Sequence, residues 1–113
     1  GVSYKPNVKD IQLSPAKYII KKFQNLGANV HIYDPNFSSG EVFGIKVEDN
    51  LDDIFSKMDA AVIVTGHDDF KEIEISSFAK MKTPILIDTR GIIEPQSVKQ
   101  YNIIFRGLGR GDF

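Results

Sequence analysis

The sequence predicts an α/β fold of the Rossmann-like kind, a three-layer sandwich in which helices flank a mainly parallel sheet. Segments of helical and strand character alternate along the 113 residues, an order typical of parallel sheets. Residues 60–65 form an unbroken apolar run, as expected for a strand buried on both faces. The length suits one domain spanning residues 1–113.

The first predicted helix has clear signals at both ends. Ser14 is a good N-cap residue, and Pro15 fits the first helical position because its missing N–H is not needed there. Gly27 supplies the positive φ of a C-terminal stop. Between them, apolar residues recur at helical spacing, at Ala16, Ile19, Ile20, Phe23 and Leu26.

A short strand is predicted next, over residues 29–34, because apolar and polar side chains alternate there. Pro35 ends this strand, since proline cannot continue a hydrogen-bonded ladder. Residues 36–41 are rich in turn-forming residues and are predicted as a loop, and residues 44–47 as a short extended piece.

The rest of the chain continues the alternation of helices and strands. The predicted elements are a helix capped by Asp49 or Asn50, the strand at 60–65, a loop at 66–69, a weaker helix within 74–81, a strand at 85–88, a helical turn from about 94 to 100, a strand at 101–106 and a flexible tail at 107–111.

The start of the chain carries no complete element before the first helix. We therefore expect residues 1–4 to be the end of a truncated first strand, and the chain to be a fragment of a longer one. A sheet that lacks most of one strand has an unpaired slot. Residues 1–5 should then be weakly anchored, or the slot should be filled by another chain.

Composition excludes several classes of function. The chain has no Cys, which rules out a disulfide scaffold, a thiolate zinc site and a Cys nucleophile, and is compatible with the cytoplasm. A net charge of −1 does not favour a nucleic-acid or anionic-membrane partner. No apolar run reaches the roughly 18 residues of a membrane span. His31 and His67 lack a metal-ligand spacing, so no metal is expected.

Cationic side chains follow several predicted strands. Lys5, Arg90 and Arg106 come at the carboxyl ends, which is the edge where open parallel sheets bind ligands. Arg can grip a phosphate with two donors, and Lys acts as a point charge. The first helix also directs its N-terminus, which favours an anion, to this edge. These residues predict a phosphate-containing ligand.

A structural interpretation of the polar residues stands beside this one. Lys5 is then a solvated charge, and Asp88 and Arg90 form a local pair or cap a turn. For His67 we favour this structural interpretation, in which it is only a turn residue. Asp34 has two possible roles, a structural one and the binding of ribose hydroxyls. No Gly-x-Gly-x-x-Gly precedes the first helix, and no helix follows the C-terminal glycines, so the spacing argues against a self-contained NAD site.

Several ordered motifs extend over essentially the whole chain. They are Gly1-Val2-Ser3-Tyr4-Lys5-Pro6-Asn7, Asp10-Ile11, Ser14-Pro15-Ala16, Gly27-Ala28 with Val30, Tyr33-Asp34-Pro35, Thr65-x-His67-x-x-Phe70 and Asp88-x-Arg90. Together they resemble the C-terminal, UDP-binding domain of the UDP-glucose/GDP-mannose dehydrogenase family. That domain usually opens Gly-Leu-x-Phe-Lys-x-x-Thr-x-Asp-x-Arg-x-Ser-Pro. The closing Arg106-Gly107-x-Gly109-Arg110-Gly111 is most similar to members that oxidise UDP-N-acetylmannosamine.

The resemblance implies an NAD-dependent nucleotide-sugar 6-dehydrogenase, which oxidises the C6 alcohol of a UDP-sugar to a carboxylate in two successive steps. An N-terminal domain would hold NAD, a central helical domain would form a homodimer or larger assembly, and this domain would bind the UDP part of the substrate. The catalytic Cys would lie upstream of this segment. We therefore expect no catalytic residue here and no activity from the isolated chain.

The resemblance also assigns site residues by position in the motifs. Tyr4 and Lys5 would contact the UDP-sugar from the loop after the first strand, and Arg90 would reach the substrate from another loop. The family's Arg that is often assigned to NAD is Gln12 here, which keeps a donor and loses the charge. The alternatives are a stand-alone flavodoxin-like regulatory or ligand-binding module, and a domain that serves mainly as an assembly surface.

Overall fold

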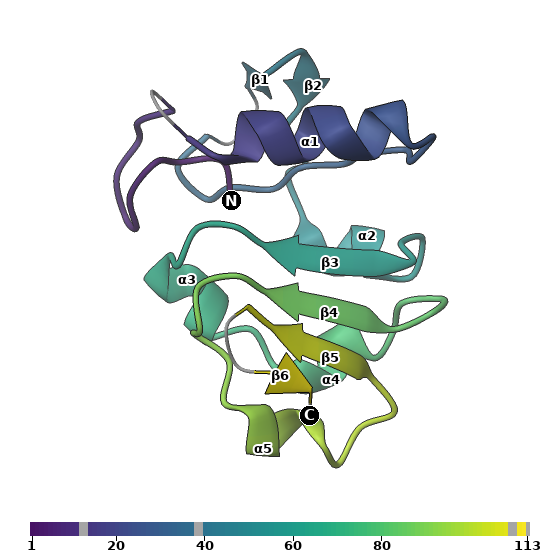
Figure 1. The fold of residues 1–113 in the computed structure, drawn as a ribbon. Coiled ribbons are helices and arrows are strands. Elements are labelled where there is room, and N and C mark those ends of the chain that lie inside the picture. Colours follow the sequence, from purple (N-terminus) through teal and green to yellow (C-terminus); the bar gives the residue numbers. More distant parts are fainter. Residues whose placement is uncertain (12–13, 38–39, 109–110, 113) are drawn as a thin grey trace.

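The computed structural model describes residues 1–11, 14–37, 40–108 and 111–112. Its main sheet has three parallel strands followed by an antiparallel strand at the edge (Figure 1), which confirms the mainly parallel sheet. In spatial order the strands are β3 (Ala60–Ile63), β4 (Ile85–Asp88), β5 (Ile104–Gly107) and β6 (Gly111–Asp112).

The helices come before and between the strands along the chain. They are α1 (Ala16–Asn25), α2 (Leu51–Phe55), α3 (Asp68–Lys71), α4 (Ile75–Phe78) and α5 (Pro95–Val98). Within the described residues, no helix has both the length and the apolar character that crossing a membrane requires.

The predicted helix signals act largely as expected. Ser14 Oγ accepts the N–H of Ala16 at 3.2 Å, but Ser14 is not the N-cap: α1 begins at Ala16 with Pro15 as its N-cap, one residue later than predicted. Asn50, one of the two predicted caps of α2, accepts the N–H of Asp52 at 3.0 Å. Gly27 has φ +91°, the left-handed conformation that ends α1.

Two apolar clusters lie on opposite faces of β3, because successive side chains of a strand point to opposite sides. Ile63 belongs to the larger cluster, whereas Val62 and Val64 contact the smaller one. The larger cluster joins the parallel strands to helices α2–α5, and the smaller one includes Ala16 and Ile20 of α1. Their buried members are Phe55, Ile63, Phe70, Phe78, Met81, Leu86, Ile93, Val98 and Phe105 in the larger cluster, and Val2, Ala16, Ile20, Ile32, Val42, Val47 and Val64 in the smaller one.

The strand predicted over residues 29–34 does not form a ladder. Its one recorded pairing is an isolated parallel bridge between Ile32 and Val47. An apolar cavity of about 910 Å³ lies between this segment and β3, lined by Val30 and Ile32 on one side and by Val62 and Val64 on the other. The segment has the predicted alternation of apolar and polar residues, but among the described residues no ladder joins it to β3.

Residues 1–4, predicted to be the end of a strand, are not assigned to any strand, and the predicted slot is the cavity beside β3. In the described part of the chain, β3 pairs with β4 alone, so Ala61 and Val62 are half-buried instead of buried on both faces as predicted. The weak anchoring expected for the first residues is wrong, however. Val2 and Ser3 are each 1% exposed and hydrogen-bonded to Asp34.

A small hairpin was not foreseen in full. β1 (Glu41–Val42) and β2 (Ile45–Lys46) pair antiparallel through the two-residue turn Phe43-Gly44. Both turn residues have positive φ, 51° and 78°, as a type I′ turn requires. The extended piece predicted over residues 44–47 is confirmed by β2. The pairing partner was missed because Phe is an unusual residue for the first turn position.

Three further differences concern element boundaries. The loop predicted at 66–69 contains the start of α3, and β5 begins at Ile104 rather than at 101. The tail predicted to be flexible folds back, so that β6 pairs antiparallel with the end of β5. Residues 109–110 of that tail lie outside the described part.

The core should be most sensitive to truncation at Leu86. This side chain of the central strand β4 is 0% exposed, so Leu86→Ala should lower the free energy of unfolding by about 3 kcal/mol through lost burial and a cavity. Urea denaturation of the chain measures this. Tyr18, 80% exposed on α1, is the control, and Tyr18→Ala should change stability by less than about 0.5 kcal/mol. Equal effects of the two substitutions would contradict the assignment of the core.

Candidate functional site

The carboxyl ends of the parallel strands and the start of α1 lie at one side of the molecule, on the left in Figure 1. The loop formed by residues 4–10 lies at the same side. The topology therefore brings together the polar residues that the sequence places after separate strands, because parallel strands end at a common edge.

The carboxylate of Asp34 is the hydrogen-bonding centre of this edge. Its Oδ2 accepts the N–H groups of Val2 at 2.9 Å and Ser3 at 3.3 Å, the Ser3 hydroxyl at 3.1 Å, and His67 Nε2 at 2.9 Å. Its Oδ1 accepts the N–H of Asn36 at 2.9 Å. Asp34 is 1% exposed. The carboxylate is thus occupied by donors from its own chain, which favours the structural role over binding of ribose hydroxyls.

The hydrogen bonds to Asp34 also keep it ionised. Burial alone raises the pKa of a carboxyl group, but the N–H groups of Asn36 and Val2 and the His67 imidazole outweigh burial, so the pKa of Asp34 lies below its ordinary value. Asp34 is therefore a buried negative charge whose neutralisation would leave several donors poorly paired.

His67 is more than the turn residue that the sequence favoured. Its side chain is 1% exposed. Nε2 lies 2.9 Å from Asp34 Oδ2, and Nδ1 accepts the N–H of Asn7 at 2.7 Å. Because a backbone N–H can only donate, Nδ1 carries no proton, and Nε2–H donates to Asp34. The ring of Phe70 packs edge-on against the imidazole, with the centroids 5.2 Å apart.

The start of the chain is fixed against the segment that follows β3. Thr65 Oγ1 donates to the Ser3 carbonyl at 2.8 Å. Gly1 lies so close to Thr65 that an added Cβ would be 2.7 Å from the Thr65 Cβ, so a larger residue would require a shift of the backbone. This contact gives a physical reason for the glycine that opens the Gly-Val-Ser-Tyr-Lys motif.

The 4–10 loop is fixed at both its base and its tip. At the base, the Tyr4 N–H donates to the Asp10 carbonyl at 2.6 Å. At the tip, Asn7 Oδ1 accepts the N–H of Asp68 at 3.0 Å, in addition to the Asn7–His67 bond. Asn7 has φ 61°, a left-handed conformation that Asn tolerates better than most residues. The sequence reasoning did not identify Asn7, whose partners are about sixty positions away.

Two of the predicted site residues extend from the base of this loop into solvent. Tyr4 is 41% exposed, and Lys5 is exposed. The Lys5 ammonium nitrogen lies 5.9 Å from the centroid of the Tyr4 ring, within reach of a cation–π interaction. A positive charge and an aromatic face are thus presented together at the carboxyl edge.

Arg90 stands on a tight turn after β4. Asp88, 0% exposed, accepts the N–H groups of Arg90 at 3.0 Å, Gly91 at 2.9 Å and Ile93 at 2.8 Å. These bonds confirm that Asp88 caps a turn. Arg90 Nε also donates to the Val64 carbonyl at 2.7 Å, while the residue as a whole is exposed.

The loops that carry Lys5 and Arg90 are attached to neighbouring points of the chain. Ser3 bonds to Thr65, and Arg90 bonds to Val64. The chain just before Lys5 and the Arg90 side chain are therefore both attached to the segment that follows β3. The third predicted cation, Arg106, donates to the carbonyl of its neighbour Phe105 at 2.8 Å. Gln12 lies outside the described residues.

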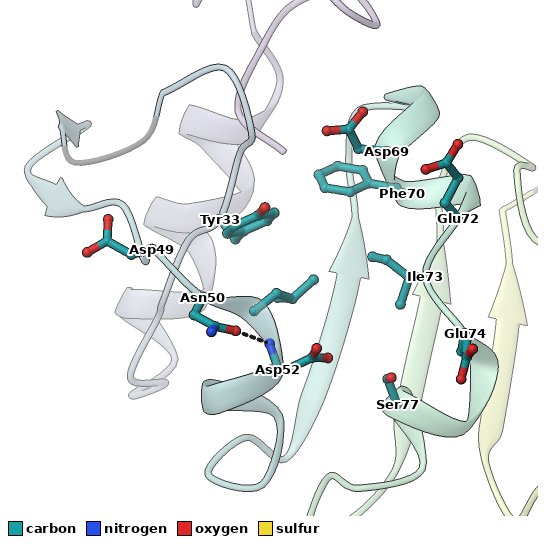
Figure 2. A pocket seen from close by; sticks show the side chains of 11 residues that line it. Tyr33, Asp49, Asn50, Asp52, Asp69, Phe70, Glu72, Ile73, Glu74 and Ser77 are labelled. Carbon is teal, nitrogen blue, oxygen red and sulfur yellow. Dashed lines mark hydrogen bonds between the residues drawn. The ribbon is translucent and has the colours of Figure 1, made fainter.

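A separate pocket of about 360 Å³ has the opposite charge (Figure 2). Tyr33 and Phe70 lie in it, and its lining includes five carboxylates and, among the described residues, no Lys or Arg. The carboxylates are Asp49, Asp52, Asp69, Glu72 and Glu74. Such an acidic pocket repels phosphate groups. Over the described ranges, no three His, Asp or Glu side chains are grouped as a metal site would require.

Residues 1–95 match the family model described as UDP-glucose/GDP-mannose dehydrogenase family, UDP binding domain. The chain belongs to this family. It is 36% identical to a UDP-N-acetyl-D-mannosamine dehydrogenase of Methanococcus maripaludis, covering 98% of this chain and 26% of the relative. It is 31% identical to a UDP-glucose 6-dehydrogenase of Rhizobium meliloti, covering 99% of this chain and 26% of the relative.

A solved structure agrees with the same assignment. The UDP-D-ManNAc dehydrogenase of Pyrococcus horikoshii superposes with a TM-score of 0.83 and 34% sequence identity, over 100% of this chain and 25% of that one. The Rossmann-like fold and the family resemblance expected from the sequence are confirmed. The chain spans about a quarter of the length of the relatives it matches.

The charge on Asp34 should make stability depend on pH in acid. Asp34→Asn should lower the free energy of unfolding by about 3 kcal/mol near neutral pH, because a buried charge loses its role in the hydrogen-bond network. A carboxyl whose pKa falls on folding stabilises the protein above its unfolded pKa, and this contribution is lost as the pH falls through the folded pKa. The difference between variant and wild type should therefore shrink below about pH 4.

Urea midpoints over a pH series measure this difference. The control is Asp59→Asn, which alters an exposed carboxyl and should leave stability nearly unchanged at every pH. A penalty for Asp34→Asn that stays constant into acid would show that the charge of Asp34 is not what stabilises the edge.

Proposed function

We propose that residues 1–113 are one domain of an NAD-dependent UDP-sugar 6-dehydrogenase and bind the UDP part of its substrate. The supporting observation is the placement of two exposed cations at the carboxyl edge of the sheet: Lys5 follows Ser3, which bonds to Thr65, and Arg90 bonds to Val64. The identity of the proposed nucleotide, UDP, comes from family membership. The reaction proposed for the whole enzyme is oxidation of the C6 alcohol to a carboxylate in two successive steps.

The chemistry of the three proposed contact residues suits a nucleoside diphosphate. Lys5 supplies a point charge near the diphosphate or the sugar, and Arg90 supplies a planar guanidinium, which suits phosphate oxygens. Tyr4 adds an aromatic face with a hydroxyl beside Lys5. Because both loops are already hydrogen-bonded in place, less conformational freedom is lost when the ligand binds.

We propose that NAD, which accepts hydride when bound, lies mainly outside this domain. Asp34, the acidic residue that a dinucleotide fold would use for ribose, is buried and already bonded to residues of its own chain. We therefore place NAD mainly on an N-terminal domain of the intact enzyme. The catalytic Cys must also come from another part, because this chain contains none, and the isolated chain should be inactive.

Further partners of the domain are proposed from family membership. In the intact enzyme it would contact the N-terminal and central domains, and the central domain would form a homodimer or a larger assembly. Relatives named for UDP-N-acetyl-D-mannosamine and for UDP-glucose both match this chain, which fits a domain that binds the shared UDP part. A nucleotide-sugar substrate and the absence of Cys favour a cytoplasmic location.

Removing either cation should weaken UDP binding. Lys5→Ala and Arg90→Ala should each raise the Kd for UDP about tenfold, because each loses a charge-assisted contact to the diphosphate. Calorimetry of the intact enzyme with UDP measures the Kd. The control residue is Lys82, which is exposed and lies in the loop before β4. Lys82→Ala should leave the Kd for UDP unchanged. If both site variants bind UDP like the wild type, the site assignment is wrong.

A further inference from the structure

We propose that His67 is a positioning residue, which sets the 4–10 loop for nucleotide binding through Asn7. The inference rests on the proposed function, because this loop carries Tyr4 and Lys5. His67 itself is buried and need not touch the nucleotide. Its role is to supply, from a buried position, the acceptor that holds the tip of the loop.

The charge on Asp34 determines which nitrogen of His67 carries the proton. Oδ2 of Asp34 accepts from Nε2 at 2.9 Å, so the proton of the neutral imidazole is held on Nε2. Nδ1 is then a pure acceptor, and it faces the N–H of Asn7 at 2.7 Å. The other tautomer would place a hydrogen on Nδ1, where it would face the Asn7 N–H, and two donors cannot form a hydrogen bond. The buried carboxylate thus selects the ring state that can hold the loop.

Asn7 makes the second half of the connection. Its backbone N–H donates to His67, and its side-chain Oδ1 accepts the N–H of Asp68 at 3.0 Å. Two hydrogen bonds of opposite direction therefore join the loop tip to consecutive residues after β3. Asn suits this position because it tolerates φ 61° and also supplies the acceptor.

Loss of the tip connection should affect binding more than folding. Residues 4–10 are exposed and lie outside both apolar clusters. The start of the chain keeps its own bonds, from Ser3 to Asp34 and from Thr65 to Ser3. A loop released at its tip would sample other conformations, and UDP would then have to select the competent one, which raises the apparent Kd.

Two substitutions separate the two hydrogen bonds of His67. His67→Gln can place an amide N–H near the position of Nε2, which keeps the bond to Asp34 and removes the acceptor for Asn7. His67→Asn can place an amide oxygen near the position of Nδ1, which keeps the acceptor for Asn7. Asn7→Gly removes the acceptor for Asp68, tolerates the positive φ and leaves the buried Asp34 untouched.

The experiment combines UDP calorimetry with amide hydrogen exchange on the intact enzyme. His67→Gln and Asn7→Gly should each raise the Kd for UDP about tenfold, and His67→Asn should recover most of the affinity lost in His67→Gln. In the two weakened variants, amides of residues 4–10 should exchange faster while those of β4 keep wild-type protection. Nitrogen-15 spectra of wild-type His67 should show the proton on Nε2.

Several outcomes would overturn the inference. The first is a wild-type Kd for UDP in both His67→Gln and Asn7→Gly, and the second is an equal loss of affinity in the Gln and Asn variants of His67. The third is unchanged amide exchange of residues 4–10. The fourth is faster amide exchange that extends to β4, which a merely structural role of His67 predicts. The proposed function fails differently. It fails if the wild-type enzyme does not bind UDP, or if Lys5→Ala and Arg90→Ala bind it normally, whatever the exchange data show.

Discussion

The buried carboxylate of Asp34 is the interaction on which the carboxyl edge of this fold depends. It joins the start of the chain, through Val2 and Ser3, to the segment after β3, through His67. A carboxylate at 1% exposure is tolerated only because chain donors surround it. Its hydrogen bonds have a further effect, since they orient the ring whose other nitrogen reaches the exposed loop.

The distribution of charge complements this arrangement. Lys5 and Arg90 extend from the carboxyl edge, whereas the carboxylates of the acidic pocket lie around Tyr33 and Phe70. A chain with a net charge of −1 can therefore present a local site for an anion. The buried acidic residues, Asp34 and Asp88, are used to shape loops, which leaves the exposed cations to define the site.

Local signals explain why most of the elements could be predicted. Asn50 caps α2 through atoms two and three residues away, and the apolar runs of β3 and β4 are visible without any partner. Non-local features escaped the sequence reasoning. Asp34 and His67 were identified as polar residues at strand ends, but the sequence does not show that they bond to each other, or that His67 holds Asn7. The segment at 29–34 has the alternation of a strand, yet a strand also needs a neighbour within hydrogen-bonding distance.

The hydrogen bonds at the edge also determine when the site can form during folding. The bonds from Val2, Ser3 and His67 to Asp34 span 31 to 33 residues, and the Asn7–His67 bond spans 60. Closing such long loops costs chain entropy before any contact compensates for it. The turn that carries Arg90 has local bonds to Asp88, but the bonds that join Arg90 to Val64 and Asn7 to His67 connect segments far apart in the sequence. The edge is therefore expected to become ordered only after β3 and α1 have packed, so that binding competence is a late product of folding rather than a property of any short segment.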